Sequence, residues 1–397
     1  MNVFHCDWCD HLVFFENTQC VQCGHVLAYL PDVGRMGALD DAGDGFWVPA
    51  RADRDGSTRY RLCANYTEQS ICNWTVPDGA GENPLCTACR LTSQIPDLSA
   101  PGNHLRWYRL EVAKRRLLYT LMRLELPITS REASPSNGLA FEFLADVDGP
   151  DPKPVLTGHA DGVITINVAE ADEPERERRR VALHEPYRTL LGHFRHEIGH
   201  YYWDVLVRDT RALAPFRRLF GDEQVDYAAA LRTHYTQGAA PDWPDRFVSA
   251  YAASHPWEDW AETWAHYLHI CDSLETAAAC GISIRPPRGD EPAAKRMPSA
   301  AGSPAARFDQ LMDSWFPLTY VLNNLNRGLG LPDGYPFVLT PVAIDKLRFV
   351  HDVIANARVA RAGHAPPMPA AQATCMDEGA SLAGNESSSA SSSRAST

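Results

Sequence analysis

Cysteines are concentrated at the start of this chain, where eight of the 11 cysteines precede residue 90. A segment this short cannot easily build a stable core from apolar residues alone, and bound metal commonly takes over part of that role. The opening residues MNVFHCDWCD lack the basic and apolar runs of a secretory signal, so we expect a cytoplasmic protein. Because thiols stay reduced in that compartment, the cysteines are expected to bind metal rather than to form disulfides.

The early cysteines form two groups of four. In the first group, ten residues separate two CxxC pairs, and this spacing lets two tight turns bring four thiolates to one tetrahedral zinc ion. A redox dithiol would need only one such pair, within a βαβ pattern that the sequence lacks. The second group is spaced more loosely, and its alternative is a small core with free, buried cysteines. The predicted ligands are Cys6, Cys9, Cys20 and Cys23 for one structural zinc ion, and Cys63, Cys72, Cys86 and Cys89 for a second.

Composition limits the classes of protein to consider. Lys and Arg number 37 against 50 Asp and Glu, and the net charge of -13 disfavours general binding to the phosphate backbone of nucleic acids. No apolar run approaches the length of a membrane span, and a hydrophobic content of 45% is typical of a soluble globular protein. The length of 397 residues favours two or three domains.

The pattern along the chain indicates four parts. Residues 1–95 are the cysteine-rich zinc-ribbon region, and residues 96–126 contain a hinge of turn-forming residues followed by a basic amphipathic helix. Residues 127–362 combine strand-like and helical patterns and contain the candidate catalytic residues. Residues 363–397 form a Ser-rich tail that we expect to be disordered, because it cannot bury a core. The strand-like run at residues 162–168 could bind an extended peptide by edge pairing.

A helical pattern from about residue 183 to residue 207 contains an HExxH motif. His196 and His200 are one helical turn apart, so both imidazoles can point from one face toward one metal ion. Glu197 can reach a water molecule at that ion without being a ligand, and Gly199 is expected to leave room beside the metal. The alternative is a surface helix whose two histidines bind nothing.

A catalytic zinc ion keeps three protein ligands and one open position, so a third ligand is needed. A second predicted helix, which opens after Pro256, carries Glu258 and Glu262 on one face. Glu258 is the predicted ligand, and Glu262 is expected to accept a hydrogen bond from a ligating histidine. The two roles could be exchanged, and Asp259 is a further candidate. Three histidines near this helix could bind the metal instead, namely His255, His266 and His269. Such residues more often pack in a core.

The two motifs together resemble the gluzincin metallopeptidases, whose third zinc ligand is a glutamate on a later helix, here in the pattern Glu258-x-x-Ala261-Glu262. The run that starts at Tyr251 resembles more closely the lethal-factor-like group, in which a tyrosine seven residues before that glutamate faces the zinc. Over roughly residues 1–360, with the zinc ribbon in front, the chain resembles the bacterial "putative zinc-binding metallopeptidase" family.

This resemblance implies an α+β protein, with small β zinc-ribbon modules followed by a mainly helical, gluzincin-like domain that has a small sheet. It implies that His196, His200 and Glu258 bind a catalytic zinc ion. It further implies that Glu197 is the general base and that Tyr251 donates a hydrogen bond to the oxyanion of the reaction.

Two functions follow from these patterns. The first is a zinc-dependent peptidase with one catalytic and two structural zinc ions, which cleaves a protein or peptide substrate. The second is a scaffold protein whose zinc ribbons dock a partner, while its metallopeptidase-like domain is catalytically idle.

Overall fold

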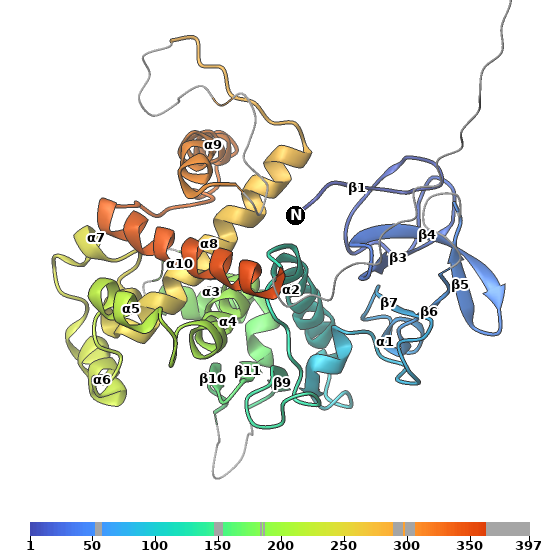
Figure 1. The fold of residues 1–397 in the computed structure, drawn as a ribbon, viewed down its shortest axis with the longest axis horizontal. Helices are drawn as coiled ribbons and strands as arrows, with labels where there is room; N and C mark the ends of the chain where they lie inside the picture. The colour runs from blue at the N-terminus through green and yellow to red at the C-terminus, as the bar shows by residue number, and fades with distance from the viewer. Residues whose placement is uncertain are drawn as a thin grey trace, which may run out of the picture.

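The computed structural model of the protein has the α+β fold that the sequence predicts (Figure 1). A small β-rich region at the N-terminus, drawn in blue, precedes a mainly helical region with a small sheet, drawn from green to red. The Ser-rich tail predicted at residues 363–397 lies outside the described residues. The structure describes residues 1–51, 58–146, 154–182, 185, 187–288, 297 and 306–362.

The N-terminal region contains a two-stranded and a five-stranded antiparallel sheet. The hairpin between the fourth and fifth strands turns at Asp44 and Gly45, whose positive φ angles of 54° and 76° suit the tight two-residue turns of hairpins. The Trp74 ring packs on the Tyr29 ring inside this region, with 4.7 Å between the centroids. The elements are β1 (Phe4–His5), β2 (Leu12–Val13), β3 (Val26–Leu30), β4 (Arg35–Gly43), β5 (Phe46–Pro49), β6 (Tyr60–Leu62), α1 (Ala64–Thr67), β7 (Thr75–Pro77) and η1 (Cys89–Leu91).

A third, four-stranded sheet joins the two regions, because β8 at the end of the cysteine-rich segment pairs in parallel with β9. Its strand order is β10-β11-β9-β8. The expectation that residues 162–168 offer a free edge is wrong, since β11 pairs with β10 on one side and with β9 on the other. The outer strand next to the HExxH helix is β10 instead. The strands are β8 (Thr92–Gln94), β9 (Ala140–Leu144), β10 (Gly158–Ala160) and β11 (Val163–Asn167).

Helices make up most of the second region. The HExxH helix begins later than predicted, at Leu190, because the Thr189 side chain accepts a hydrogen bond from the Gly192 amide at 3.0 Å and caps the helix. None of the helices in the described part of the chain is long and apolar enough to span a membrane. The helices are α2 (Asn103–Arg123), η2 (Val168–Ala171), α3 (Glu173–Ala182), α4 (Leu190–Leu206), α5 (Leu213–Phe220), α6 (Tyr227–Gln237), α7 (Trp243–Arg246), η3 (Tyr251–Ser254), α8 (Pro256–Ala279), α9 (Phe308–Gly328) and α10 (Pro341–Ala362).

Helices α4 and α8 cross closely at the centre of this region, where Gly199 faces α8. A Cβ atom on Gly199 would lie 3.0 Å from the Ala261 Cα and 3.2 Å from the Trp264 Cβ. The Trp260 Nε1 donates a hydrogen bond of 2.9 Å to the Gly199 carbonyl and fixes the crossing. The space that Gly199 leaves is therefore occupied by α8, which corrects the expectation that it leaves room beside a metal.

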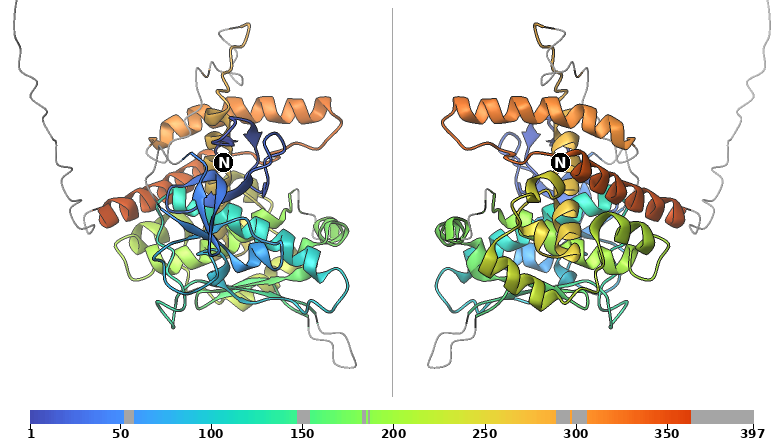
Figure 2. Two further views of the ribbon diagram at one scale, coloured as in Figure 1. Left: turned by 90° about the vertical axis from the view of Figure 1, so that its right-hand side faces the viewer. Right: turned by 90° about the vertical axis from the view of Figure 1, so that its left-hand side faces the viewer.

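One continuous cluster of buried apolar side chains runs through both regions, from Phe4 in β1 to Ile354 in α10. Helix α2 lies between the regions and packs on α4, while α10 covers α8 (Figures 1 and 2). The Tyr119 ring on α2 lies within 6.1 Å of the rings of Phe15 and Tyr29, measured between centroids. The core of the N-terminal region is thus continuous with that of the helical region.

Candidate metal centres

The HExxH residues lie near the middle of α4. His196 and His200 project from one face of the helix, with their ring centroids 5.0 Å apart. His200 is buried and its ring lies 4.0 Å from the Trp257 ring, which limits its motion. Glu197 is also buried, with 8% of its surface exposed.

Glu258 in the first turn of α8 completes a three-residue cluster with the two histidines. Pro256 occupies the first turn of this helix, and the His255 side chain caps it by accepting a hydrogen bond from the Trp257 amide at 3.1 Å. Glu258 Oε2 lies 3.0 Å from His196 Nε2 and 3.5 Å from His200 Nε2. This buried oxygen is not aligned for a hydrogen bond with any described group. Three potential ligand atoms therefore face one point.

Glu262, one turn further along α8, lies behind this cluster. Its Oε1 is 2.8 Å from His196 Nδ1, the ring nitrogen that faces away from Glu258. Its Oε2 accepts a hydrogen bond of 2.7 Å from the Ser249 hydroxyl, which in turn accepts one from the Ala252 amide. The two glutamates thus occupy different positions, with Glu258 at the point of convergence and Glu262 on the outer side of an imidazole.

Tyr227, at the start of α6, was not singled out by the sequence. Its hydroxyl donates a hydrogen bond of 2.6 Å to Glu258 Oε1, the carboxylate oxygen that does not face the histidines. No local spacing connects this tyrosine to α8, since Tyr227 and Glu258 are 31 positions apart in the sequence. Tyr227 directly follows Asp226, which caps α6, but an aromatic residue after a capping Asp is too common a pattern to identify a functional residue.

Tyr251, on η3, lies next to the cluster, with 5.9 Å between its ring centroid and that of His196. Burial raises the pKa of its hydroxyl well above the usual value, so this group stays protonated near neutral pH and can donate a hydrogen bond.

Burial and opposite charges set the ionisation of the cluster. Burial raises the pKa of Glu197, and the neighbouring His196 and His200 offset only part of that increase. Burial acts in the same direction on Glu258, but His200 and His196 hold the pKa of that carboxyl well below its usual range. For His196, burial lowers the pKa, and the carboxylates of Glu258 and Glu262 raise it well above its usual value. Glu258 is therefore an anionic group, whereas Glu197 holds a proton more readily than an ordinary glutamate.

The other candidates from the sequence have different partners. The buried carboxylate of Asp259 accepts a hydrogen bond of 2.6 Å from Lys346 Nζ on α10. His255 caps α8, and its second ring nitrogen lies 3.0 Å from the Val225 carbonyl oxygen. His266 Nδ1 lies 2.7 Å from the Tyr335 hydroxyl. His269 packs against the rings of Trp315 and Tyr335.

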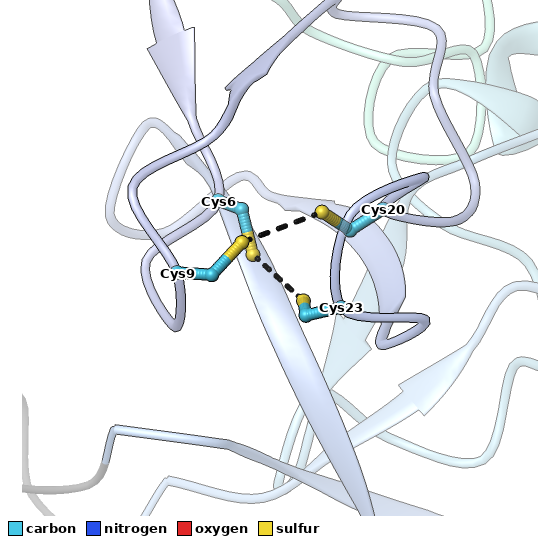
Figure 3. A group of neighbouring side chains, drawn as sticks. All are labelled: Cys6, Cys9, Cys20 and Cys23. Carbon is cyan, nitrogen blue, oxygen red and sulfur yellow. Dashed lines mark hydrogen bonds between the residues drawn. The ribbon is translucent and has the colours of Figure 1, made fainter.

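The first cysteine group comes from two turns, one between β1 and β2 and one between β2 and β3, and the four side chains point toward one another (Figure 3). The two CxxC pairs approach each other, with sulfur–sulfur distances of 3.7 Å between Cys6 and Cys23 and 3.6 Å between Cys9 and Cys20. Each turn ends in a residue with positive φ, Asp10 at 58° and Gly24 at 78°, which folds the chain tightly around the sulfurs. All four thiols are free, and the arrangement suits a tetrahedral ion.

The second cysteine group lies where the N-terminal region meets α2. Its four cysteines are buried and free, and the sulfurs of Cys72 and Cys86 are 3.7 Å apart. The Cys86 amide lies 3.3 Å from the Cys63 sulfur and donates a hydrogen bond to it, a contact that stabilises a thiolate. The buried Arg115 of α2 donates a hydrogen bond to the Ile71 carbonyl at 2.7 Å. Burial lowers the pKa of Arg115, but Cys72 and the other neighbouring anionic groups raise it by more, so the net shift is upward. A cationic side chain thus faces a group of potential thiolates.

Comparison with known families gives two matches. Residues 103–353 match the model of the family described as "Putative zinc-binding metallo-peptidase", and residues 3–100 match that of a zinc-ribbon domain. An uncharacterized protein of Mycobacterium bovis and another of Mycobacterium tuberculosis are each 44% identical to this chain over 356 residues, which is 89% of this chain and 95% of each relative. No solved structure matches the chain.

Proposed function

Because the chain belongs to the family of zinc-binding metallopeptidases that it matches, we propose that it is a zinc-dependent peptidase whose catalytic centre is formed by His196, His200 and Glu258. The observation that carries the proposal is the convergence of two imidazoles and one carboxylate, whose candidate ligand atoms all lie within 4.8 Å of one another. Three protein ligands of this kind, with one position left open, are typical of hydrolytic zinc sites.

The residues of this centre fit a zinc ion in their chemistry as well as in their position. Glu258 Oε2 is buried between His196 Nε2 at 3.0 Å and His200 Nε2 at 3.5 Å without an aligned hydrogen bond. A cation bound between these three atoms would satisfy it. Glu262 takes the outer nitrogen of His196, so the inner nitrogen is left to bind metal. Bound zinc would act as a Lewis acid that lowers the pKa of water and polarises a peptide carbonyl.

Glu197 is the proposed general base and general acid. Its carboxylate takes a proton from the attacking water and later delivers it to the amine that leaves. The raised pKa of Glu197 suits both steps, because a group that titrates closer to neutral pH both accepts and releases a proton readily.

Tyr251 is the proposed donor to the oxyanion that forms when water attacks the carbonyl. Its raised pKa keeps the hydroxyl protonated, and its ring adjoins His196. A single donor of this kind contributes about 3 kcal/mol to the stability of the transition state in comparable sites.

The proposed substrate is an extended segment of a protein or peptide that pairs with β10. This strand is at the outer edge of the sheet and packs near α4. The ring of His159, in the middle of β10, lies 6.3 Å from that of His200, so a chain bound along this edge would pass close to the candidate centre.

The test compares cleavage of a peptide library by the wild type and by Glu197→Gln, with Glu177→Gln on the surface of α3 as a control. We expect cleavage to fall by about 10²- to 10⁴-fold in Glu197→Gln, because the amide cannot accept the proton, and to be unchanged in the control. Zinc content is measured in parallel and should equal that of the wild type in both variants. If the wild type binds no zinc beyond its cysteine groups and cleaves no peptide, the proposal is wrong and the scaffold function is favoured.

A further inference from the structure

The hydrogen bond from Tyr227 to Glu258 joins two very different environments. Glu258 is almost fully buried, with 1% of its surface exposed, whereas Tyr227 is 38% exposed. The phenol nevertheless reaches the carboxylate, because its ring fits between His255 and Trp257, whose ring centroids lie 5.2 and 5.9 Å away. A surface side chain therefore makes a direct contact inside the candidate centre.

Helix α6, which Tyr227 begins, is attached to the protein only weakly. None of its side chains is fully buried, and its main neighbour is η3. The helix is stabilised locally by Asp226, whose side chain accepts a hydrogen bond of 2.9 Å from the Ala229 amide. The contact through Tyr227 is thus a principal link between α6 and the candidate centre.

This contact leaves Glu258 with one oxygen for a metal. Oε1 accepts the hydrogen bond from Tyr227, and Oε2 remains between the two imidazoles. Without the phenol, the carboxylate could rotate about its terminal bond, and Oε1 would have no donor among the described residues. Ligating groups that are held by such outer contacts bind metal more tightly, because their orientation is fixed before the ion arrives.

We propose that Tyr227 is a positioning residue that holds Glu258 in one orientation, so that the docking of α6 sets the affinity of the centre for its metal. This inference rests on the proposed function, which identifies Glu258 as a ligand. Within that function, Tyr227 acts on the metal through the Glu258 carboxylate that it holds.

The experiment measures zinc affinity by competition with a chelator, using full-length protein. Tyr227→Phe retains the ring and removes only the hydroxyl, and the matched control is Tyr320→Phe on the exposed side of α9. Zinc at the two cysteine groups serves as an internal reference in each protein. We expect Tyr227→Phe to bind the remaining zinc ion about 10- to 100-fold more weakly than the wild type and the control. After cobalt replaces that zinc, the visible absorption spectrum should also change, because the carboxylate ligand is no longer fixed.

A second variant, Asp226→Ala, weakens α6 without altering any group that contacts Glu258. We expect a smaller loss of affinity in the same direction. The inference is overturned if Tyr227→Phe and the wild type have equal zinc affinity and the same cobalt spectrum. These readouts are independent of cleavage. A wild type that binds the third zinc ion but cleaves no peptide would refute the peptidase function, and the role of Tyr227 would still be decided by the zinc affinity and the cobalt spectrum of Tyr227→Phe.

Discussion

Two glutamates one helical turn apart on α8 have different surroundings, and this difference defines the candidate centre. Glu258 has one oxygen bound by Tyr227 and the other between two imidazoles, whereas both oxygens of Glu262 are engaged, one by Ser249 and one by His196. Residues from other elements therefore hold the two carboxylates in different positions.

Replacing Glu262 by Gln tests this division. The amide would accept a weaker hydrogen bond from His196 Nδ1 or would present its NH₂ group to it, so the imidazole would be oriented less well. We expect zinc affinity or peptidase activity to fall by about 10- to 100-fold. Chelator competition and cleavage rate measure the effect, and Ser249→Ala should give a smaller loss of the same sign. Unchanged affinity in Glu262→Gln would contradict the role that we give to this residue.

The sequence predicts the parts of the site that depend on local spacing. The HExxH motif, the i, i+4 glutamates and the CxxC pairs are each set by the geometry of one helix or one turn, and the structure brings these residues together. The sequence left the roles of Glu258 and Glu262 exchangeable because the groups that distinguish them, Tyr227 and Ser249, come from other elements. Contacts between distant segments follow from tertiary packing, which no periodic pattern encodes.

At the scale of elements, the centre depends on the crossing of α4 and α8. Each helix supplies part of the candidate ligand set, so the distance between their axes determines whether the three groups could share one ion. Gly199 permits the close approach, since its missing Cβ leaves space for the α8 backbone at Ala261. Two predictions about elements were wrong. The helical pattern extended on the N-terminal side of Thr189, which caps α4 in the structure. The strand-like pattern at residues 162–168 gave no sign that β11 lies inside the sheet.

Gly199→Ala should therefore destabilise the protein although alanine favours helices. The added methyl group would press on Ala261 and Trp264 and force the helices apart, which in well-packed cores costs about 1–3 kcal/mol. Chemical denaturation measures the free energy of unfolding, and zinc affinity should fall with it. Gly328→Ala at the end of α9 is the matched control, since nothing lies within 4 Å of its added Cβ. This control should be neutral or stabilised by up to about 1 kcal/mol. Equal stability of Gly199→Ala and the wild type would show that the crossing tolerates a wider spacing.

At the scale of the whole molecule, the zinc ribbon and the helical region depend on each other. Helix α2 places the buried Arg115 beside the second cysteine group, and its other side chains share the core with α4. A tetrathiolate zinc site carries two net negative charges, so a buried guanidinium next to it offsets part of that charge.

Stepwise removal of metal should reveal this dependence. We expect three zinc ions per chain, of which a mild chelator removes one, because that ion has three protein ligands while each of the others has four thiolates. Loss of the first ion should abolish cleavage and leave the helical signal in circular dichroism almost unchanged. Modification of the thiols should then release the other two ions and unfold both regions together, since one core connects them. Native mass spectrometry counts the ions at each step. A helical region that stays folded after all the zinc is lost would refute this dependence.

The parallel pairing of β8 with β9 has a practical consequence for any attempt to isolate the part of the chain that matches the peptidase family. A fragment that starts at residue 103, where the peptidase family match begins, would lack β8 and leave one side of β9 without a partner. That strand has the sequence AFEFL, and both of its phenylalanines are fully buried in the intact protein. An apolar strand with open amide and carbonyl groups recruits strands from other molecules, so the shortened chain would be prone to aggregate. Strand β8, which pairs with this side of β9, would thus keep the helical half from aggregating.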